Sequence, residues 1–338
     1  MIVTARLDDF VLPLATPLAT ARGTIFERRG LVLVVQDGDG HWGRGEVAPL
    51  PGWSSIDLDG ARVELSGWVE ASNGDRTVAS AGGLAAETRA GIDCALWSLR
   101  AARAGVPLWR ALPFEAGASE SGEREVAVNA LAVGSTPGEL LASVADWIAA
   151  GYRCIKVKLG MPDDVVRLRA LADHVPEGVS VRLDANAAWP LDEAVHHAGL
   201  AHSLLGDRLE YVEDPVADLG DLEGWAQRCE VPVAVDELVR TSADLDHVID
   251  RQLATVLVVK PPMLGGITNV LELASVARSG AVDVVVSSLY DGPVGLSAWC
   301  HLAAALGGTR AHGLGTATLF APGTADQLVP RAGVIRLR

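Results

Sequence analysis

The sequence predicts a (β/α) barrel preceded by an α+β domain that caps it. The main observation is a series of short apolar runs that each end in a charged residue, 23 to 29 residues apart: Lys158, Asp184, Glu213, Asp236 and Lys260. Each step has the length of one buried strand plus one crossover helix. The second observation is that residues 1 to about 120 lack this repeat. We therefore expect two parts of different architecture.

The first part is predicted to contain a hairpin followed by a helix. Residues 30–36 and 41–46 have the composition of strands, and the Asp-Gly pattern of residues 37–40 is typical of a tight turn between them. Residues 84–104 carry apolar side chains at helical spacing and are followed by Gly105, as many helices are. An antiparallel sheet followed by helices is an α+β arrangement.

The rest of the chain is predicted to alternate strands and helices. The expected strands are residues 126–133, 154–160, 179–184, 209–213, 231–236, 254–260, 282–288 and 310–316. The expected helices include residues 137–150, 163–174, 267–278 and 295–306. We expect residues 121–317 to form the barrel and residues 1–120 to form the cap, with residues from about 318 to 338 returning to the cap.

The strand at residues 154–160 carries two lysines on one face. Successive side chains of a strand point to opposite faces, so Lys156 and Lys158 project side by side while Val157 points the other way. An unpaired buried charge is costly, so the face that carries the lysines must be wet, acidic or metal-bearing. All strand carboxyl ends of a barrel meet at one mouth, where catalytic groups lie. The five charged ends are therefore expected to share one pocket.

Three carboxylates on successive strands suit a hard divalent cation. Asp184, Glu213 and Asp236 offer the oxygen ligands that Mg²⁺ prefers, and Mn²⁺ is a possible substitute. The alternative is that each carboxylate caps the helix after its strand, as Asp and Glu often do. Three carboxylates in register with lysines on both sides favour the metal site.

The lysines suit proton abstraction next to a substrate carboxylate. A lysine acts as a base when its pKa falls from about 10.4 toward 7 or 8, and a neighbouring lysine and a cation shift the pKa in that direction. Lys158 and Lys260 are expected to face each other across the pocket, while a metal holds the resulting enediolate. The alternative is that the lysines only form salt bridges with the carboxylates.

Composition and motifs exclude several other classes of function. The formal net charge of −15 argues against nucleic acid as a partner. No apolar run approaches the roughly 20 residues of a membrane span, and the N-terminus lacks a secretion signal, so we expect a cytoplasmic protein with a small-molecule carboxylate substrate. The four cysteines are far apart and suggest neither disulfides nor zinc. The oligomeric state stays open.

The charged strand ends and their neighbours resemble the enolase superfamily, in its muconate-lactonizing subgroup. The motifs that carry this resemblance are Lys156-Val157-Lys158, Leu183-Asp184-Ala185-Asn186, Val212-Glu213-Asp214-Pro215, Val235-Asp236-Glu237 and Lys260-Pro261-Pro262-Met263-Leu264-Gly265-Gly266. The resemblance implies a modified (β/α)₇β barrel with an α+β capping domain. It also implies one Mg²⁺ held by Asp184, Glu213 and Asp236.

Within this subgroup the chain is most similar to the family of o-succinylbenzoate synthases, which are lyases of menaquinone biosynthesis. The similarity lies in residues 20–24, 45–53, 286–288 and 313–316. It implies a syn dehydration of 2-succinyl-6-hydroxy-2,4-cyclohexadiene-1-carboxylate (SHCHC). The implied catalytic residues are Lys158 as the base that also protonates the departing hydroxide, Lys260 as the cation that stabilises the enediolate, and Lys156. The implied substrate-binding residues are Asn186, Ser287, Ser288, Gly313 and Arg22.

Two other readings use the same residues. An N-acylamino acid racemase, a dipeptide epimerase or a cycloisomerase would also need lysines on both sides of the pocket. Epimerases are expected to have an Asp-x-Asp motif at the last strand, but residues 313–316 are Gly-Leu-Gly-Thr. This difference disfavours an epimerase. Residues 288–295 differ from the serine-richer segment common in the synthases. A non-catalytic scaffold is disfavoured because all five charged positions are present.

Overall fold

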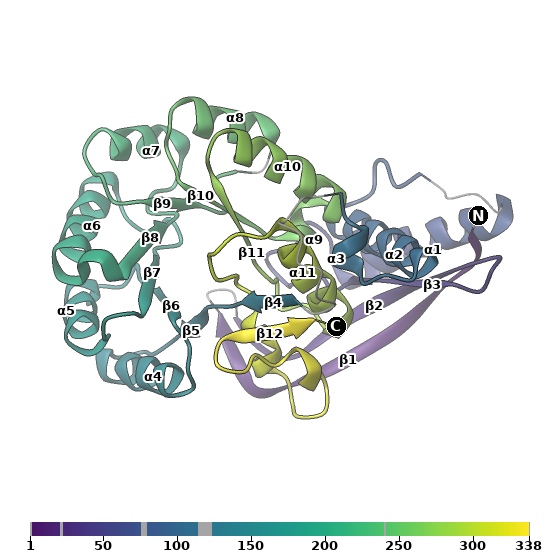
Figure 1. The fold of residues 1–338 in the computed structure, drawn as a ribbon, viewed down its shortest axis with the longest axis horizontal. Helices are drawn as coiled ribbons and strands as arrows, with labels where there is room; N and C mark the ends of the chain where they lie inside the picture. The colour runs from purple at the N-terminus through teal and green to yellow at the C-terminus, as the bar shows by residue number, and fades with distance from the viewer. Residues whose placement is uncertain (1, 21–22, 76–79, 114–123, 240, 338) are drawn as a thin grey trace.

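The structure is a computed structural model that describes residues 2–20, 23–75, 80–113, 124–239 and 241–337. Figure 1 shows an antiparallel sheet of long strands beside helices in the N-terminal part, and a strongly curled parallel sheet whose outer side is covered by helices. The predicted fold class, a modified (β/α)₇β barrel with an N-terminal α+β cap, is confirmed.

The N-terminal sheet has the order β1-β2-β3 and is antiparallel throughout. Its strands are β1 (Ile2–Thr20), β2 (Gly23–Asp37) and β3 (Trp42–Val47). The hairpin that residues 30–46 predict is therefore present, and β1 extends it by a strand that the sequence pattern did not indicate. Figure 1 shows β1 and β2 as a long two-stranded ribbon that extends past β4 and β12.

Two helices cover one face of this sheet and form its core. They are α1 (Leu58–Asp75) and α2 (Ala86–Ala104), and α2 ends at Gly105 as predicted, with Gly105 in the left-handed conformation. The core between sheet and helices contains the buried side chains of Leu31, Leu33, Val35, Leu65, Trp68, Ile92 and Leu99. A short helix, α3 (Leu108–Ala111), follows α2. Helix α1 was not predicted.

The first predicted barrel strand, residues 126–133, is split in two, and the prediction of one continuous strand is wrong. Its first half, β4 (Arg124–Ala127), pairs antiparallel with β12 (Val334–Leu337). Its second half, β5 (Ala130–Ala132), joins the parallel sheet. The change of partner occurs at Val128, whose amide donates to the Gly333 carbonyl.

The parallel sheet contains seven strands in the described part of the chain, in the order β11-β10-β9-β8-β7-β6-β5. The strands after β5 are β6 (Cys154–Lys158), β7 (Ser180–Asp184), β8 (Leu209–Glu213), β9 (Val233–Val235), β10 (Val256–Val259) and β11 (Asp283–Val286). His312 and Gly313 connect the two edges, because His312 bridges Val128 and Gly313 bridges Ser287, both in parallel. The predicted closing segment thus closes the ring through two residues.

Helices alternate with these strands along the chain. They are α4 (Pro137–Ala149), α5 (Asp164–His174), α6 (Leu191–Leu205), α7 (Leu219–Ala226), α8 (Ser242–Asp250), α9 (Pro261–Leu264), α10 (Ile267–Ser279) and α11 (Pro293–Leu306). The single turns of 3₁₀ helix are η1 (Gly206–Arg208), η2 (Gly315–Leu319) and η3 (Asp326–Leu328). A capping box of Thr136 and Glu139 fixes the start of α4.

The strands are buried on both faces, as their continuous apolar runs predict. Every residue of β10 is buried. Outward-facing side chains pack on the helices in the main core, whereas Tyr211, Ala234, Val256, Val258 and Val285 form a separate buried cluster. Three of these five, Tyr211, Val258 and Val285, also line the cavity at the mouth of the barrel. The cluster therefore lies beneath that cavity.

The division into a cap of residues 1–120 and a barrel of residues 121–317 stays a prediction, because its boundary falls in residues 114–123, outside the described residues. After the barrel, Phe320 bridges Leu14 of β1, whereas β12 pairs with β4. None of the helices in the described ranges combines the length and the apolar character that crossing a membrane requires.

Candidate active site

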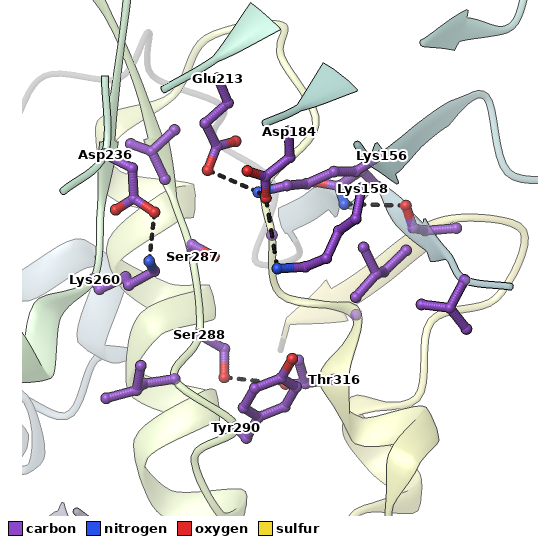
Figure 2. Close-up of a pocket in the computed structure, with 18 of the residues that line it drawn as sticks. Lys156, Lys158, Asp184, Glu213, Asp236, Lys260, Ser287, Ser288, Tyr290 and Thr316 are labelled. Atoms are coloured by element: carbon purple, nitrogen blue, oxygen red, sulfur yellow. Dashed lines mark hydrogen bonds and ion pairs between the residues drawn. The ribbon is translucent and has the colours of Figure 1, made fainter. Parts of the chain in front are cut away.

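Six charged residues in or directly after the barrel strands line one cavity of about 300 Å³, to which Glu237 also contributes. They are Lys156, Lys158, Asp184, Glu213, Asp236 and Lys260 (Figure 2). Register explains why they meet: Lys158 pairs with Asp184 across β6 and β7, and Asp184 pairs with Glu213 across β7 and β8. In-register neighbours of a parallel sheet point to the same face, so these side chains all face the barrel interior.

Lys156 lies between two of the carboxylates. Its Nζ is 2.8 Å from Asp184 Oδ2 and 2.7 Å from Glu213 Oε1. Burial lowers the Lys156 pKa, but the charges of Asp184 and Glu213 outweigh burial and raise the pKa well above its ordinary value. Lys156 is therefore a fixed cation between these two carboxylates. The expectation that a neighbouring lysine and a bound cation lower the pKa of the catalytic lysine stays a prediction.

Lys260 forms a second ion pair, with Asp236, on the other side of the cavity (Figure 2). Burial lowers the Lys260 pKa, but the Asp236 charge and hydrogen bond raise it above its ordinary value. Lys260 is therefore held as a cation by Asp236. A side chain that keeps its positive charge next to the cavity suits stabilisation of a developing negative charge.

Lys158 is the least constrained of the three lysines. Its side chain is 41% exposed, and its Nζ is 3.9 Å from Asp184 Oδ2. Its Nζ donates a 3.2 Å hydrogen bond to Asn186 Oδ1. Asn186 in turn donates to Asp184 Oδ1 from its side chain at 2.7 Å and from its backbone at 3.1 Å. Asn186, predicted to bind substrate, thus lines the cavity and also links Lys158 to Asp184.

Asp214 supports the site from behind, although sequence reasoning gave it no role. Its carboxylate accepts hydrogen bonds from the backbone amides of Asp236 at 3.0 Å and Glu237 at 2.9 Å. Burial raises the Asp214 pKa to about 7, and the Asp236 charge acts in the same direction. These bonds fix the backbone directly after β9, where Asp236 lies. Asp214 therefore helps to position the Asp236 carboxylate. The position of Asp214 directly after Glu213 was the feature of the sequence that could have indicated its role.

The donor set around the cavity fits a divalent metal ion. Asp184, Glu213 and Asp236 supply only oxygen, which hard cations such as Mg²⁺ prefer. Burial, together with the charges of Asp184 and Asp236, raises the Glu213 pKa to about 8 against the opposing effect of Lys156. Mutual repulsion among the three carboxylates persists although Lys156 and Lys260 are paired with them. Additional positive charge would therefore be favourable here.

A second group of potential metal ligands lies elsewhere, in the turn of the β2–β3 hairpin. Ligand atoms of Asp37, Asp39 and His41 lie within 4.8 Å of one another. Asp37 already accepts hydrogen bonds from Arg103 Nε at 2.6 Å and from the backbone amides of Asp39 and His41, both at 2.9 Å. The Arg103 bond holds the Asp37 pKa far below its usual range. These contacts account for the arrangement without a metal.

The remaining predicted substrate contacts are distributed as follows. Ser287, Ser288 and Gly313 line the cavity. A Cβ at Gly313 would lie 2.6 Å from Ser287 Oγ, so the close approach of these segments requires glycine there. Arg22 lies outside the described residues. Cavity residues that sequence reasoning missed include Leu18, Leu50, Trp53, Asn129, Trp147, Tyr152, Tyr290, Thr316 and Leu319. Leu18 belongs to β1, and the others come from loops and helices, where no regular spacing of side chains indicates them.

Comparison with known families decides the membership of the chain. The family described as enolase C-terminal domain-like matches residues 139–337, and the MenC N-terminal domain matches residues 2–99. The chain belongs to the enolase C-terminal domain-like family. The resemblance of the charged strand ends to the enolase superfamily is thereby confirmed. Members of this superfamily bind a divalent metal ion, in agreement with the oxygen donors of the cavity.

Individual members of the superfamily are similar over different lengths. The o-succinylbenzoate synthase of Mycolicibacterium smegmatis is 38% identical over 192 residues, which are 55% of this chain and 57% of that protein. The aligned part thus spans less than two thirds of that curated relative. The structure of o-succinylbenzoate synthase from Thermosynechococcus elongatus, complexed with Mg in its active site, superposes with a TM-score of 0.71 at 25% identity, covering 92% of each chain.

A third similarity concerns the fold alone. The dipeptide epimerase from Enterococcus faecalis, complexed with Mg and the dipeptide L-Leu-L-Tyr, has a TM-score of 0.83. It is 21% identical to this chain, and the superposition covers 99% of both chains. Proteins of different activity therefore share this backbone, and the side chains that line the cavity must decide the reaction.

Proposed function

We propose that this protein is an o-succinylbenzoate synthase, a dehydratase that converts SHCHC into 2-succinylbenzoate. One observation carries the proposal: Lys158 and Lys260 lie on opposite sides of a cavity whose third side is formed by Asp184, Glu213 and Asp236 (Figure 2). The similarity to o-succinylbenzoate synthases in both the N-terminal part and the barrel supports the choice of substrate.

Asp184, Glu213 and Asp236 are the residues that would hold Mg²⁺, and Mn²⁺ offers a similar preference for oxygen ligands. When bound, the ion supplies positive charge that stabilises the carboxylate oxygens of the substrate as the neighbouring carbon loses its proton. Mg²⁺ is named because the T. elongatus synthase contains it in its active site. Lys156, which contacts two of these carboxylates, balances their charge and keeps their positions.

The lysines divide the proton chemistry. Lys158 Nζ accepts the proton from the carbon next to the substrate carboxylate, and its few contacts leave it free to reach that carbon. The carbon–oxygen bond to the hydroxyl group then breaks. Lys158 returns the proton to the departing hydroxide, so water leaves on the same face and the ring becomes aromatic. Lys260 remains a cation and stabilises the negative charge that develops between these two events.

The decisive experiment is an assay of purified protein with SHCHC in the presence of Mg²⁺. We expect formation of 2-succinylbenzoate, measured as the loss of the diene absorbance of SHCHC. We expect no activity after chelation of the metal with EDTA. Parallel assays with N-succinyl amino acids and dipeptides test 1,1-proton transfer by the same two lysines. Turnover of these substrates with none of SHCHC would overturn the dehydratase in favour of a racemase or epimerase. We place the enzyme in the cytoplasm, with a small-molecule carboxylate as its partner.

A further inference from the structure

A buried arginine joins two loops that line the cavity. Arg28 of β2 is 2% exposed, and its guanidinium donates to three backbone carbonyls: Ala48 at 2.5 Å, Pro49 at 3.1 Å and Tyr290 at 2.9 Å. The first two carbonyls belong to the loop after β3, which continues to the cavity residue Trp53. The third belongs to the loop after β11. One side chain thus fixes a wall built from the N-terminal sheet and from the barrel.

Two buried carboxylates complete this cluster. Glu46 of β3 accepts hydrogen bonds from the amides of Gly292 at 2.5 Å and Gly295 at 2.9 Å, at the start of α11. Asp291 accepts a 3.0 Å hydrogen bond from Ser288 Oγ. Both carboxylates are nearly inaccessible to solvent. The loop between β11 and α11 is therefore held on both sides of Tyr290, which protrudes from its middle.

Tyr290 has a backbone conformation that a bulky residue rarely adopts. Its φ is 56°, in the left-handed region. Such a conformation persists when the surrounding contacts impose it, and residues held in this way are concentrated at functional sites. Here Arg28 contacts the Tyr290 carbonyl directly, and the anchored Asp291 and Gly292 follow in the chain. The strained conformation of this loop directs the phenol ring of Tyr290 into the cavity.

The hydroxyl of Tyr290 is available to a ligand. Figure 2 shows the ring beside Ser288 and Thr316, with its hydroxyl pointing toward the side where the lysines lie. Within the described residues the hydroxyl has no hydrogen-bond partner, whereas Thr316 Oγ1 already donates to Ser288 Oγ at 3.1 Å. Burial raises the Tyr290 pKa, whereas the positive charges of Lys156 and Lys260 act in the opposite direction.

We propose that Tyr290 determines specificity in this cavity by donating a hydrogen bond to an oxygen of the carboxylate substrate, and that Arg28 is the residue that positions it. The identity of the substrate in this inference rests on the proposed function. The polar wall opposite the carboxylates is present whatever the substrate is. Tyr290 touches the ligand, whereas Arg28 acts through the loop.

The first test replaces Tyr290 by phenylalanine, which removes only the hydroxyl. We expect KM for SHCHC to rise and the Kd of 2-succinylbenzoate, measured by calorimetry with Mg²⁺, to increase by roughly 10- to 100-fold, as for a lost hydrogen bond to a charged group. The Tm of Tyr290→Phe should equal that of the wild type. Unchanged KM and Kd would overturn the role of Tyr290.

The second test compares Arg28→Lys with a matched control, Arg208→Lys. Arg208 also donates to backbone carbonyls, those of Ala172, Val175, Leu204 and Leu205, but it precedes β8 at the end of the barrel away from the cavity. Both variants should lower Tm. Only Arg28→Lys should raise KM and Kd, and it should add little to the effect of Tyr290→Phe in the double variant. Full additivity, or equal kinetic effects of the two arginine variants, would overturn the positioning role.

Failure of this inference and failure of the proposed function give different results. Absence of SHCHC turnover in the wild type overturns the proposed function. The ratio of Tyr290→Phe to wild type can still be measured with N-succinyl amino acids, and a ratio near one for every carboxylate that binds overturns the role of Tyr290 alone. A wild type that binds none of these carboxylates in the presence of Mg²⁺ overturns both.

Discussion

Lys156 and Glu213 form an ion pair of 2.7 Å across the end of β7, although their own strands, β6 and β8, are not neighbours. The pair exists because side chains from alternate strands of a small barrel reach a common centre. Lys156 contacts Asp184 at the same time. The acidic end of the barrel is thus partly neutralised by lysines of the chain, and a divalent ion would use the same oxygens.

The first prediction concerns this competition. Glu213→Gln removes one carboxylate while Lys156 keeps its contact with Asp184, so the fold should persist. We expect the affinity for Mg²⁺ to fall by at least the roughly 10- to 100-fold that follows when a group supporting a metal ligand is removed. Isothermal calorimetry with MgCl₂ measures this, and the Mg²⁺-dependent rise in Tm should shrink in parallel.

The control for this prediction lies in the turn between β2 and β3. Asp39→Asn removes a carboxylate from the second group of potential ligands, Asp37, Asp39 and His41. We expect its Mg²⁺ affinity to equal that of the wild type, because contacts within the chain account for that turn. If Asp39→Asn loses as much affinity as Glu213→Gln, the metal site has been assigned to the wrong end of the molecule.

The second prediction separates proton transfer from binding. Lys158→Ala removes an amine whose described contacts are Asn186 and a distant approach to Asp184, so Tm and Mg²⁺ affinity should stay near wild type. Loss of a general base is expected to lower kcat by roughly 10²- to 10⁴-fold. Lys158→Arg should be similarly inactive, because a guanidinium does not lose its proton near neutral pH. Activity within a few-fold of wild type in either variant would show that another group removes the proton.

The charged strand ends could be predicted from the sequence because two physical rules coincide there. An unpaired charge is costly inside a buried parallel strand, and the interior charges Arg182 of β7 and Glu210 of β8 are paired with each other. Lys158, Asp184 and Glu213 end their strands, and a barrel brings such ends together. The split at residues 126–133 could not be predicted. Val126, Val128, Ala130 and Ala132 are all buried, so their alternation continues unbroken while the hydrogen-bond partner changes from β12 to β6.

Tyr290 and β1 were missed for other reasons. The position of Tyr290 depends on Arg28, which is 262 residues away in the chain and leaves no local pattern. In β1, both faces of the outer half are largely exposed, so the strand lacks the apolar alternation that indicates a half-buried strand. Long-range contacts between loops of two sheets thus shape the wall of the cavity that contains Tyr290, whereas the periodic barrel places the carboxylates of Asp184, Glu213 and Asp236.

The third prediction uses the pH dependence of stability. Burial and the charge of Asp291 together raise the Glu46 pKa to about 7, so folded protein holds this proton more tightly than unfolded protein. The stability that Glu46 contributes is therefore fully present below pH about 4.5 and is lost as pH rises through about 7, by roughly 3 kcal/mol in total. Urea unfolding between pH 5 and 8 should show a steeper fall for wild type than for Glu46→Gln.

The comparison between these two proteins isolates Glu46, because Glu213 and Asp214 also have raised pKa values and contribute equally to both. Glu46→Gln keeps one acceptor for the amides of Gly292 and Gly295, so it should remain folded. Parallel curves, with the same slope against pH, would mean that Glu46 is ionised at all these pH values and that Arg28 balances its charge.

The fourth prediction tests how β3 is placed against α2, since β3 carries Glu46. A Cβ at Gly45 would lie 1.8 Å from the carbonyl oxygen of Gly91 in α2, a backbone atom that cannot move aside without moving the helix. We expect Gly45→Ala to lower the free energy of unfolding by at least about 2–3 kcal/mol. Gly67→Ala is the matched control, because Gly67 lies exposed within α1 with no atom near its would-be Cβ, and alanine should stabilise that helix by roughly 0.5–1 kcal/mol. Urea unfolding of both variants measures the free energy of unfolding, which should fall for Gly45→Ala and rise for Gly67→Ala. A Gly45→Ala protein as stable as the wild type would mean that β3 and α2 are not in contact as described.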